Sequence, residues 1–135
     1  MPRYMLDTNI CIYLMKHHPP EVEERFAQCY VGDVVISAIT LAELEYGVAC
    51  SGSQRKRNRA ALDAFLEEVP AAPFDAKTAE AYGPIRLATR DRKRDALDKL
   101  IAAHAVALGV ILVTNNLADF AGYPGLQLEN WVPGH

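Results

Sequence analysis

One stretch, residues 97–120, constrains the fold more than any other part of the chain. Its first half has apolar residues at helical spacing, which predicts a helix whose buried face carries Leu97, Leu100, Ile101, Ala105 and Leu108. Gly109 follows, and glycine suits the left-handed backbone conformation just past a helix end. The run 110–113 is short and wholly apolar, as in parallel strands that are covered on both faces. The stretch therefore predicts a helix that leads into a buried parallel strand.

The same alternation of strands and helices recurs earlier in the chain. Residues 3–6 form an apolar run that stops at Asp7, and residues 34–36 form another, followed by Thr40 and a helical pattern over 41–49. Further helices are expected over 8–15 with Thr8 and Asn9 as caps, and over 21–29, 54–69 and 75–92, with a last edge strand over 126–128. This recurrence predicts an α/β fold with a doubly wound parallel sheet.

Length and composition limit the class of protein. A chain of 135 residues is about one domain, so residues 1–135 are expected to form a single domain. Three cysteines without a C-x-x-C pair indicate neither a disulfide framework nor a zinc site, and a reducing cytoplasm is expected. No apolar run matches a signal-peptide core or a membrane span, so no membrane association is expected.

Four acidic residues stand at or near the predicted edge where parallel strands end. These are Asp7, Glu43, Asp98 and Asp119. Ligands of open α/β sheets bind outside the carboxyl ends of the strands, which is where Asp7 and Asp119 are predicted to lie. On the helix over 41–49, Glu43 shares a small, polar side with Thr40, whereas Glu45 lies beside the apolar stripe, so Glu43 is the better candidate for the cleft.

If these acids lie close together, their negative charges need to be neutralised. Two carboxylates about 4 Å apart repel by ~4 kcal/mol at an effective dielectric constant near 20, so a cluster either takes up protons or binds cations. Oxygen ligands without nearby Cys or His favour a hard metal, Mg²⁺ or Mn²⁺, and such a site suits phosphodiester hydrolysis. Each acid alone also has an ordinary structural explanation as a turn, first-turn or loop residue.

Four motifs together resemble those of the PIN-domain ribonucleases, and more narrowly the VapC toxins of bacterial toxin–antitoxin pairs. They are MLDTN at 5–9, SAITLAELEYG at 37–47, DKLIAAHA at 98–105 and VTNNLADF at 113–120. The resemblance runs in the same order from Met5 to Trp131. It implies a PIN-like three-layer fold, with a mostly parallel five-stranded sheet and helices on both faces, and an endoribonuclease that depends on Mg²⁺ or Mn²⁺ and blocks translation.

The resemblance also assigns residues and partners. The catalytic and metal-binding acids carry onto Asp7, Glu43, Asp98 and Asp119, and the supporting polar residues onto Asn9, Thr40, Thr114, Asn115 and Asn116. It implies a VapB-type antitoxin that occludes the site, a toxin homodimer, and a complex of toxin and antitoxin that binds operator DNA through the antitoxin. The MLDTN start favours a transfer RNA substrate, the initiator tRNA in particular.

A basic run precedes Asp98. It consists of Arg86, Arg90, Arg92, Lys93 and Arg94, and it is either a solvated face or a rim that attracts RNA phosphates. Family members often have a glycine-containing turn with an isoleucine before the third acid, whereas this chain reads RDRKRDAL over 90–97. The conformation of that loop is therefore the part of the site that the resemblance predicts least.

Three alternatives compete with the ribonuclease interpretation. A haloacid-dehalogenase-type phosphatase needs a second Asp two residues after the first, where this chain has Asn9. A phospho-receiver domain needs a lysine after a late strand, where this chain has Thr114, Asn115 and Asn116. A non-catalytic PIN-like interaction or co-repressor protein stays open, although the full set of acids speaks against it. His104, which lies among Ala and Val, is expected to be buried and structural.

Overall fold

The computed structural model describes residues 1–134, and they form an α/β fold. The strands are β1 (Tyr4–Leu6), β2 (Val34–Ser37), β3 (Ala71–Ala72), β4 (Ile111–Val113) and β5 (Gln127–Glu129). The helices are α1 (Thr8–Lys16), α2 (Pro20–Ala27), α3 (Ala38–Ala49), α4 (Arg55–Glu68), α5 (Ala76–Ala88), α6 (Ala96–Leu108) and α7 (Leu117–Phe120), with a 3-10 turn, η1 (Gly52–Gln54).

The five strands form one sheet in the order β3-β2-β1-β4-β5, and every neighbouring pair is parallel. In register, Tyr4 pairs with Val34 on one side and with Ile111 on the other. Because side chains alternate across a strand, Tyr4 and Leu6 join one apolar core and Met5 joins the other. The predicted doubly wound parallel sheet is confirmed, and so are the five strands that the resemblance implies.

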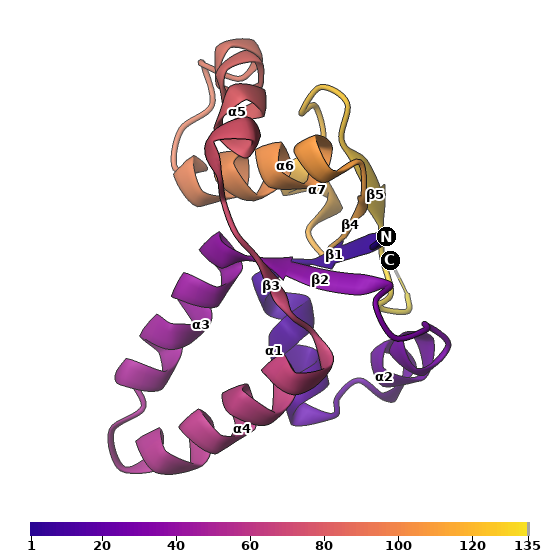
Figure 1. Cartoon of the computed structure of the whole chain (residues 1–135), viewed down its shortest axis with the longest axis vertical. Helices are drawn as coiled ribbons and strands as arrows, with labels where there is room; N and C mark the ends of the chain where they lie inside the picture. The colour runs from indigo at the N-terminus through magenta and orange to yellow at the C-terminus, as the bar shows by residue number, and fades with distance from the viewer. Residues whose placement is uncertain (135) are drawn as a thin grey trace.

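Helices cover both faces of the sheet (Figure 1). Residues of α1, α2, α3 and α4 pack in the core that contains Tyr4 and Leu6, and residues of α5, α6 and α7 pack in the core that contains Met5. Figure 1 shows α3 and α6 beginning at the same edge of the sheet, where β2 ends. The three-layer arrangement therefore gathers helix starts and strand ends at one edge.

The start of α1 differs from the expectation. Asp7 is the cap, because its carboxylate accepts a 2.9 Å hydrogen bond from the backbone N–H of Ile10, while Thr8 and Asn9 lie within the helix. Similarly, α3 begins at Ala38 rather than at residue 41, because Ser37 Oγ accepts a 3.0 Å hydrogen bond from the N–H of Ile39. Both caps follow directly on their strands, so no loop separates strand from helix.

Other boundaries also move. Helix α5 ends at Ala88, not near residue 92, and the following turn is held by the Thr89 hydroxyl, which donates a 2.7 Å hydrogen bond to the carbonyl of Ile85. On α6, Leu97 and Leu108 were expected to be buried, but they are 46% and 36% exposed. Ile101 and Ala105 are buried as predicted, and the other buried residues of α6 are Lys99, Ala102, Ala103 and His104.

Within residues 1–134, no helix has both the length and the apolar character needed to cross a bilayer.

Candidate active site

Asp7 stands where β1 ends and α1 begins, and its side chain is only 4% exposed. Its backbone N–H donates a 3.0 Å hydrogen bond to the carbonyl of Val113, which joins the ends of β1 and β4. Burial raises the pKa of the Asp7 carboxyl above its ordinary value, and the charge of Glu43 adds to the rise. A side-chain hydrogen bond from Thr114 opposes the rise. The carboxylate is thus held rigidly beside another acid.

Glu43 lies on α3 and is half-buried. Its Oε1 accepts a 2.8 Å hydrogen bond from the hydroxyl of Thr8, which directs the carboxylate toward the start of α1. Glu45, two residues on, points elsewhere and forms an ion pair with Arg59 of α4. The helical spacing therefore separates the two acids as expected, and Thr8 is a positioning residue that the sequence did not reveal.

Asp98 lies in the first turn of α6 and is half-buried. Burial, followed by the negative charges of Asp119 and Glu43, raises the pKa of Asp98 to about 6. The charges of Asp95 and Asp7 add to the rise. Because carboxylates perturb one another only at short range, Asp119, Glu43 and Asp7 all lie within electrostatic reach of Asp98.

Asp119 lies on α7 and is exposed to solvent. Its backbone carbonyl accepts a hydrogen bond from the guanidinium of Arg92, so the turn before α6 is attached to the helix that carries the fourth acid. The second hydrogen bond from Arg92, to the carbonyl of Ala121 at 2.8 Å, lies just after α7.

The four acids do not enclose a common point. Among residues 1–134, no three His, Cys, Asp or Glu side chains are close enough to hold a metal ion between them. The donor set nevertheless fits a hard divalent cation, because it is all oxygen and because Mg²⁺ binds through one or two carboxylates and keeps several waters.

The predicted polar residues take different positions around these acids. Thr40 and Thr114 are fully buried, and Thr114 Oγ1 accepts a 2.9 Å hydrogen bond from the N–H of Asn116. Asn9 is exposed beside Asp7, whose carboxylate also accepts a backbone hydrogen bond from that residue. Asn115 is directed toward α1, with its amide nitrogen 3.5 Å from the hydroxyl of Tyr13. Of these predicted polar residues, Thr114 contacts Asp7 through its side chain and Asn9 contacts it through its backbone.

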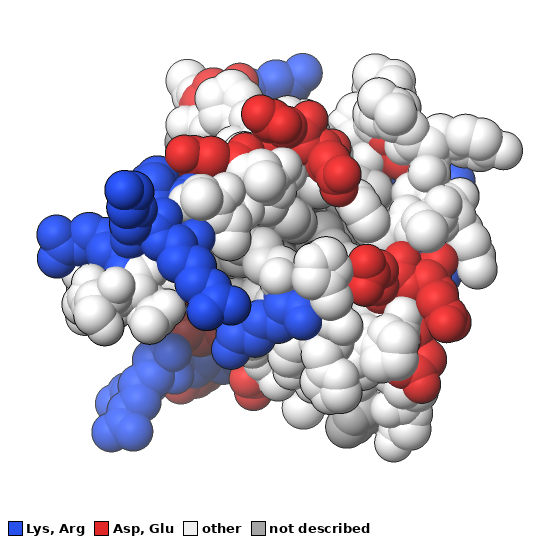
Figure 2. Space-filling model, turned by 90° about the horizontal axis from the view of Figure 1, so that it is seen from below, with Lys and Arg blue, Asp and Glu red and all other residues white. Residues whose placement is uncertain are grey.

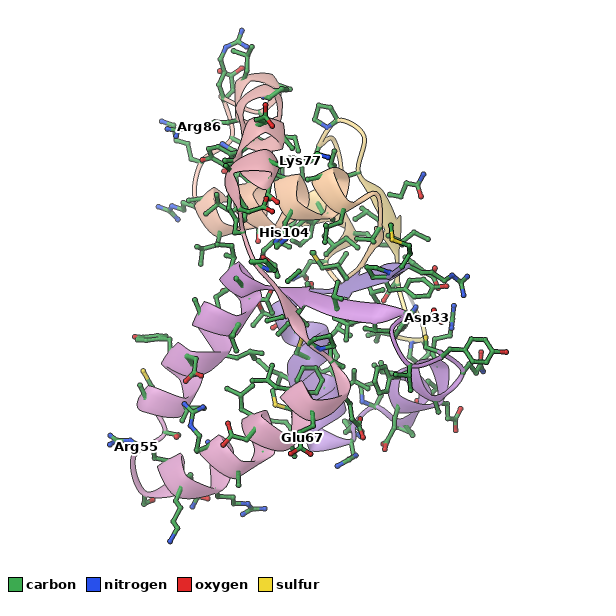
Figure 3. All side chains as sticks on the ribbon, in the orientation of Figure 1. Asp33, Arg55, Glu67, Lys77, Arg86 and His104 are labelled. Carbon is green, nitrogen blue, oxygen red and sulfur yellow. The ribbon has the colours of Figure 1, made fainter. Side chains whose placement is uncertain are left out.

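The basic run divides into two kinds of residue. Arg86, Arg90, Lys93 and Arg94 are exposed, and Figure 3 shows Arg86 projecting outward from α5. Arg92 is different, because it is only 32% exposed and its guanidinium contacts the chain itself. A second basic group lies on the first turn of α4 and consists of Arg55, Lys56 and Arg57. Figure 2, which views the molecule from below, shows Lys and Arg gathered on one side.

His104 is fully buried, as expected. It points from α6 toward the sheet (Figure 3), and its Nδ1 lies 2.7 Å from Ser37 Oγ. Phe74 packs edge-on against the ring, with 5.3 Å between centroids. Burial lowers the pKa of His104, so the imidazole is a neutral core residue that supports the start of α3.

Comparisons with known proteins identify the family. A PIN domain match covers residues 4–125. The tRNA(fMet)-specific endonuclease VapC of Shigella flexneri is 41% identical over 133 residues, which are 97% of this chain and 99% of that protein. Ribonuclease VapC2 of Rickettsia felis is 40% identical, with 95% and 97% of the two chains covered.

The fold has equally similar solved counterparts. The crystal structure of DNA-bound VapBC from Salmonella typhimurium contains a chain that superposes with a TM-score of 0.89 at 37% identity, over 98% of this chain and 100% of that chain. The family match, the relatives and the superposition all span nearly the whole length. This chain therefore belongs to the PIN domain family and, within it, to the VapC ribonucleases.

Proposed function

We propose that the chain is a toxin that cleaves RNA phosphodiester bonds with Mg²⁺, or with Mn²⁺ in its place, and so inhibits translation. The observation that carries the proposal is the gathering of acids around Asp98 at one sheet edge, where burial and then the charges of Asp119 and Glu43 raise its pKa to about 6. PIN-domain nucleases generally depend on divalent metals, and this cluster supplies the negative charge that such an ion neutralises.

The residues divide the work by position. Asp7 and Asp98 would hold the ion, since both are half-buried or buried and both lie where a strand ends or a helix begins. Glu43 and Asp119 complete the charge around them, and the Thr8 hydroxyl fixes Glu43. When bound, such an ion activates water and neutralises charge on the phosphodiester oxygens. The side-chain hydrogen bond from Thr114 favours the ionised form of Asp7 and so opposes the effect of burial on its pKa.

We further propose a transfer RNA substrate, with the initiator tRNA as the first to test. The support is the relative from Shigella flexneri, which is named a tRNA(fMet)-specific endonuclease. We propose a VapB-type antitoxin as the partner that blocks the acids, a toxin homodimer, and operator binding by the complex, because the related VapBC assemblies were solved on DNA. The proposed place of action is the cytoplasm, where tRNA and operator DNA are found.

The direct test is cleavage by the purified chain freed of antitoxin. Initiator tRNA, elongator tRNAs and an unstructured RNA are incubated with Mg²⁺, Mn²⁺ or excess EDTA, and new RNA ends are mapped. Asp7→Asn and Asp98→Asn are expected to cut about 10³-fold more slowly, the equivalent of ~4 kcal/mol of lost transition-state stabilisation. Glu67→Gln on the exposed face of α4 is the matched loss of charge and should cut normally.

Several outcomes would contradict the proposal or a part of it. Cleavage that survives EDTA, or that is unchanged in Asp98→Asn, would remove the metal site. Metal-dependent cutting of all RNAs alike would keep the endoribonuclease and refute the tRNA preference. A chain that binds antitoxin and operator DNA but cuts no RNA would establish the non-catalytic alternative.

A further inference from the structure

Arg92 is half-buried, and its guanidinium contacts the chain itself on several sides. Nη1 and Nη2 donate to the carbonyls of Ala121 and Asp119, so both ends of the guanidinium face the segment around α7. The Arg92 Cζ atom lies 4.5 Å from the centroid of the Tyr123 ring, which covers one face. Nε lies 3.6 Å from Asp95 Oδ2. A guanidinium engaged in this way has little capacity left for an RNA phosphate.

The partners of Arg92 are themselves held in place. Asp95 is 7% exposed, and its carboxylate accepts a 2.7 Å hydrogen bond from the Tyr123 hydroxyl. Its other oxygen lies 3.0 Å from Lys99 Nζ, and Lys99 also donates to the carbonyl of Arg92 at 3.3 Å. We call these four residues, Arg92, Asp95, Lys99 and Tyr123, the Arg92 clamp.

The clamp joins the two segments that carry Asp98 and Asp119. Asp95 precedes α6 directly, and Lys99 is the residue next to Asp98. Arg92 reaches the carbonyl of Asp119 itself. Helix α7 has only four residues, so its own hydrogen bonds constrain it weakly and external contacts must set its position. The clamp supplies those contacts.

We propose that Arg92 is a positioning residue, which sets the distance of Asp119 from Asp98 by holding α7 to the turn before α6. The inference rests on the proposed function, because it assigns Arg92 a role in the metal site rather than in RNA attraction. This role separates Arg92 from the other arginines of the turn over 90–97. Arg92 holds α7 in place, whereas Arg90 and Arg94 are exposed.

The test separates metal binding from RNA binding. Mn²⁺ affinity is measured by calorimetry without RNA, and kcat and KM are measured on the RNA that the wild type cleaves. Arg92→Ala and Arg92→Lys are both expected to weaken Mn²⁺ binding about 10-fold and to lower kcat by a similar factor, with KM unchanged, as for loss of a residue that orients metal ligands. Lys keeps the charge but lacks the planar fork that reaches two carbonyls over an aromatic ring.

Arg90→Ala is the matched control, because Arg90 is exposed and its recorded contact is local, to the carbonyl of Leu87. It should leave Mn²⁺ affinity unchanged. In an Asp119→Asn background, Arg92→Ala should cost little further Mn²⁺ affinity, because its effect passes through Asp119. Should Arg92→Ala fail to fold by circular dichroism, Tyr123→Phe removes only the hydroxyl on Asp95 and should shift Mn²⁺ affinity in the same direction.

Three results overturn the clamp: Arg92→Lys with wild-type Mn²⁺ affinity, Arg92→Ala with a raised KM alone, or full additivity with Asp119→Asn. A wild-type chain that binds no Mn²⁺ or cuts no RNA contradicts the proposed function. A wild type that binds and cuts beside an Arg92→Ala variant with unchanged Mn²⁺ affinity contradicts only the clamp.

Discussion

The hydroxyl of Thr8 donates a 2.8 Å hydrogen bond to Oε1 of Glu43, which joins the first residue of α1 to α3 across 35 positions of sequence. Asp7 immediately precedes Thr8, so one short segment holds one acid of the site and orients a second. Strands β1 and β2 lead straight into α1 and α3, and the hydrogen bond links the start of α1 to the middle of α3.

Thr8→Val should lower kcat for RNA cleavage about 10-fold, because a hydrogen bond to a charged group contributes about 1.5 kcal/mol. Valine keeps the shape of threonine and removes the donor. Thr8→Ser keeps the hydroxyl and should retain most of the activity. Equal losses in the two variants would mean that the methyl group, rather than the hydrogen bond to Glu43, is what the site needs.

Asp98→Asn should make the metal-free protein more stable at pH 7. Since burial and neighbouring acids raise the pKa of Asp98 to about 6, the folded state binds this proton more tightly than the unfolded state. Wild-type stability therefore falls as pH rises from about 4 to 6, and the variant escapes this loss. We expect a gain of about 1 kcal/mol, since solvent screens part of the repulsion at a half-buried carboxyl.

Urea unfolding in EDTA at pH 4 and pH 7 measures this effect. The two proteins should differ much less at pH 4, where Asp98 is protonated in the folded state and about half protonated in the unfolded state, and Mg²⁺ at pH 7 should stabilise the wild type more than the variant. A variant that is less stable than the wild type at pH 7 without metal would show that Asp98 is not under electrostatic strain.

His104 should make stability sensitive to acid in the opposite sense. Burial lowers its pKa, so below about pH 6.5 the unfolded state gains a proton that the folded state resists, and acid favours unfolding. The stability advantage of the wild type over His104→Gln should therefore shrink between pH 7.5 and 5.5. The matched control is His18→Gln, at an exposed position, which should leave the stability at pH 7.5 nearly unchanged. A stability difference between the wild type and His104→Gln that stays constant from pH 7.5 to 5.5 would contradict a buried, neutral imidazole.

The order of strands and helices could be predicted because it depends on local patterns. The apolar run 110–113 indicates a buried strand, and Gly109 before it indicates a reversal of the chain after the helix. The acids could be placed at the sheet edge for the same reason, since Asp7 follows its strand without an intervening loop. Periodicity also separated Glu43 from Glu45, and the structure directs them to different neighbours.

Features that depend on distant partners could not be predicted. Leu97 and Leu108 fit the apolar spacing of α6, yet the helix turns its alanines and His104 inward because α5 and the sheet approach it closely. Lys99 is 7% exposed only because Asp95 neutralises it. Arg92 looks like its basic neighbours in sequence, and only the fold shows that its partners are carbonyls of the 119–121 segment.

Arg90 and Arg94 are the exposed arginines nearest to Arg92 in the sequence, and they remain candidates for contact with RNA phosphates. Neutralising both as glutamine should weaken RNA binding and reduce the slope of log K against log salt by about 0.7 for each lost phosphate contact. Fluorescence anisotropy with the Asp98→Asn protein measures binding without cleavage. Lys77→Gln, a loss of charge at the start of α5, is the control and should leave the slope unchanged. Because counterion release follows the number of phosphates contacted, an unaltered slope in the double variant would show that these arginines are only solvated.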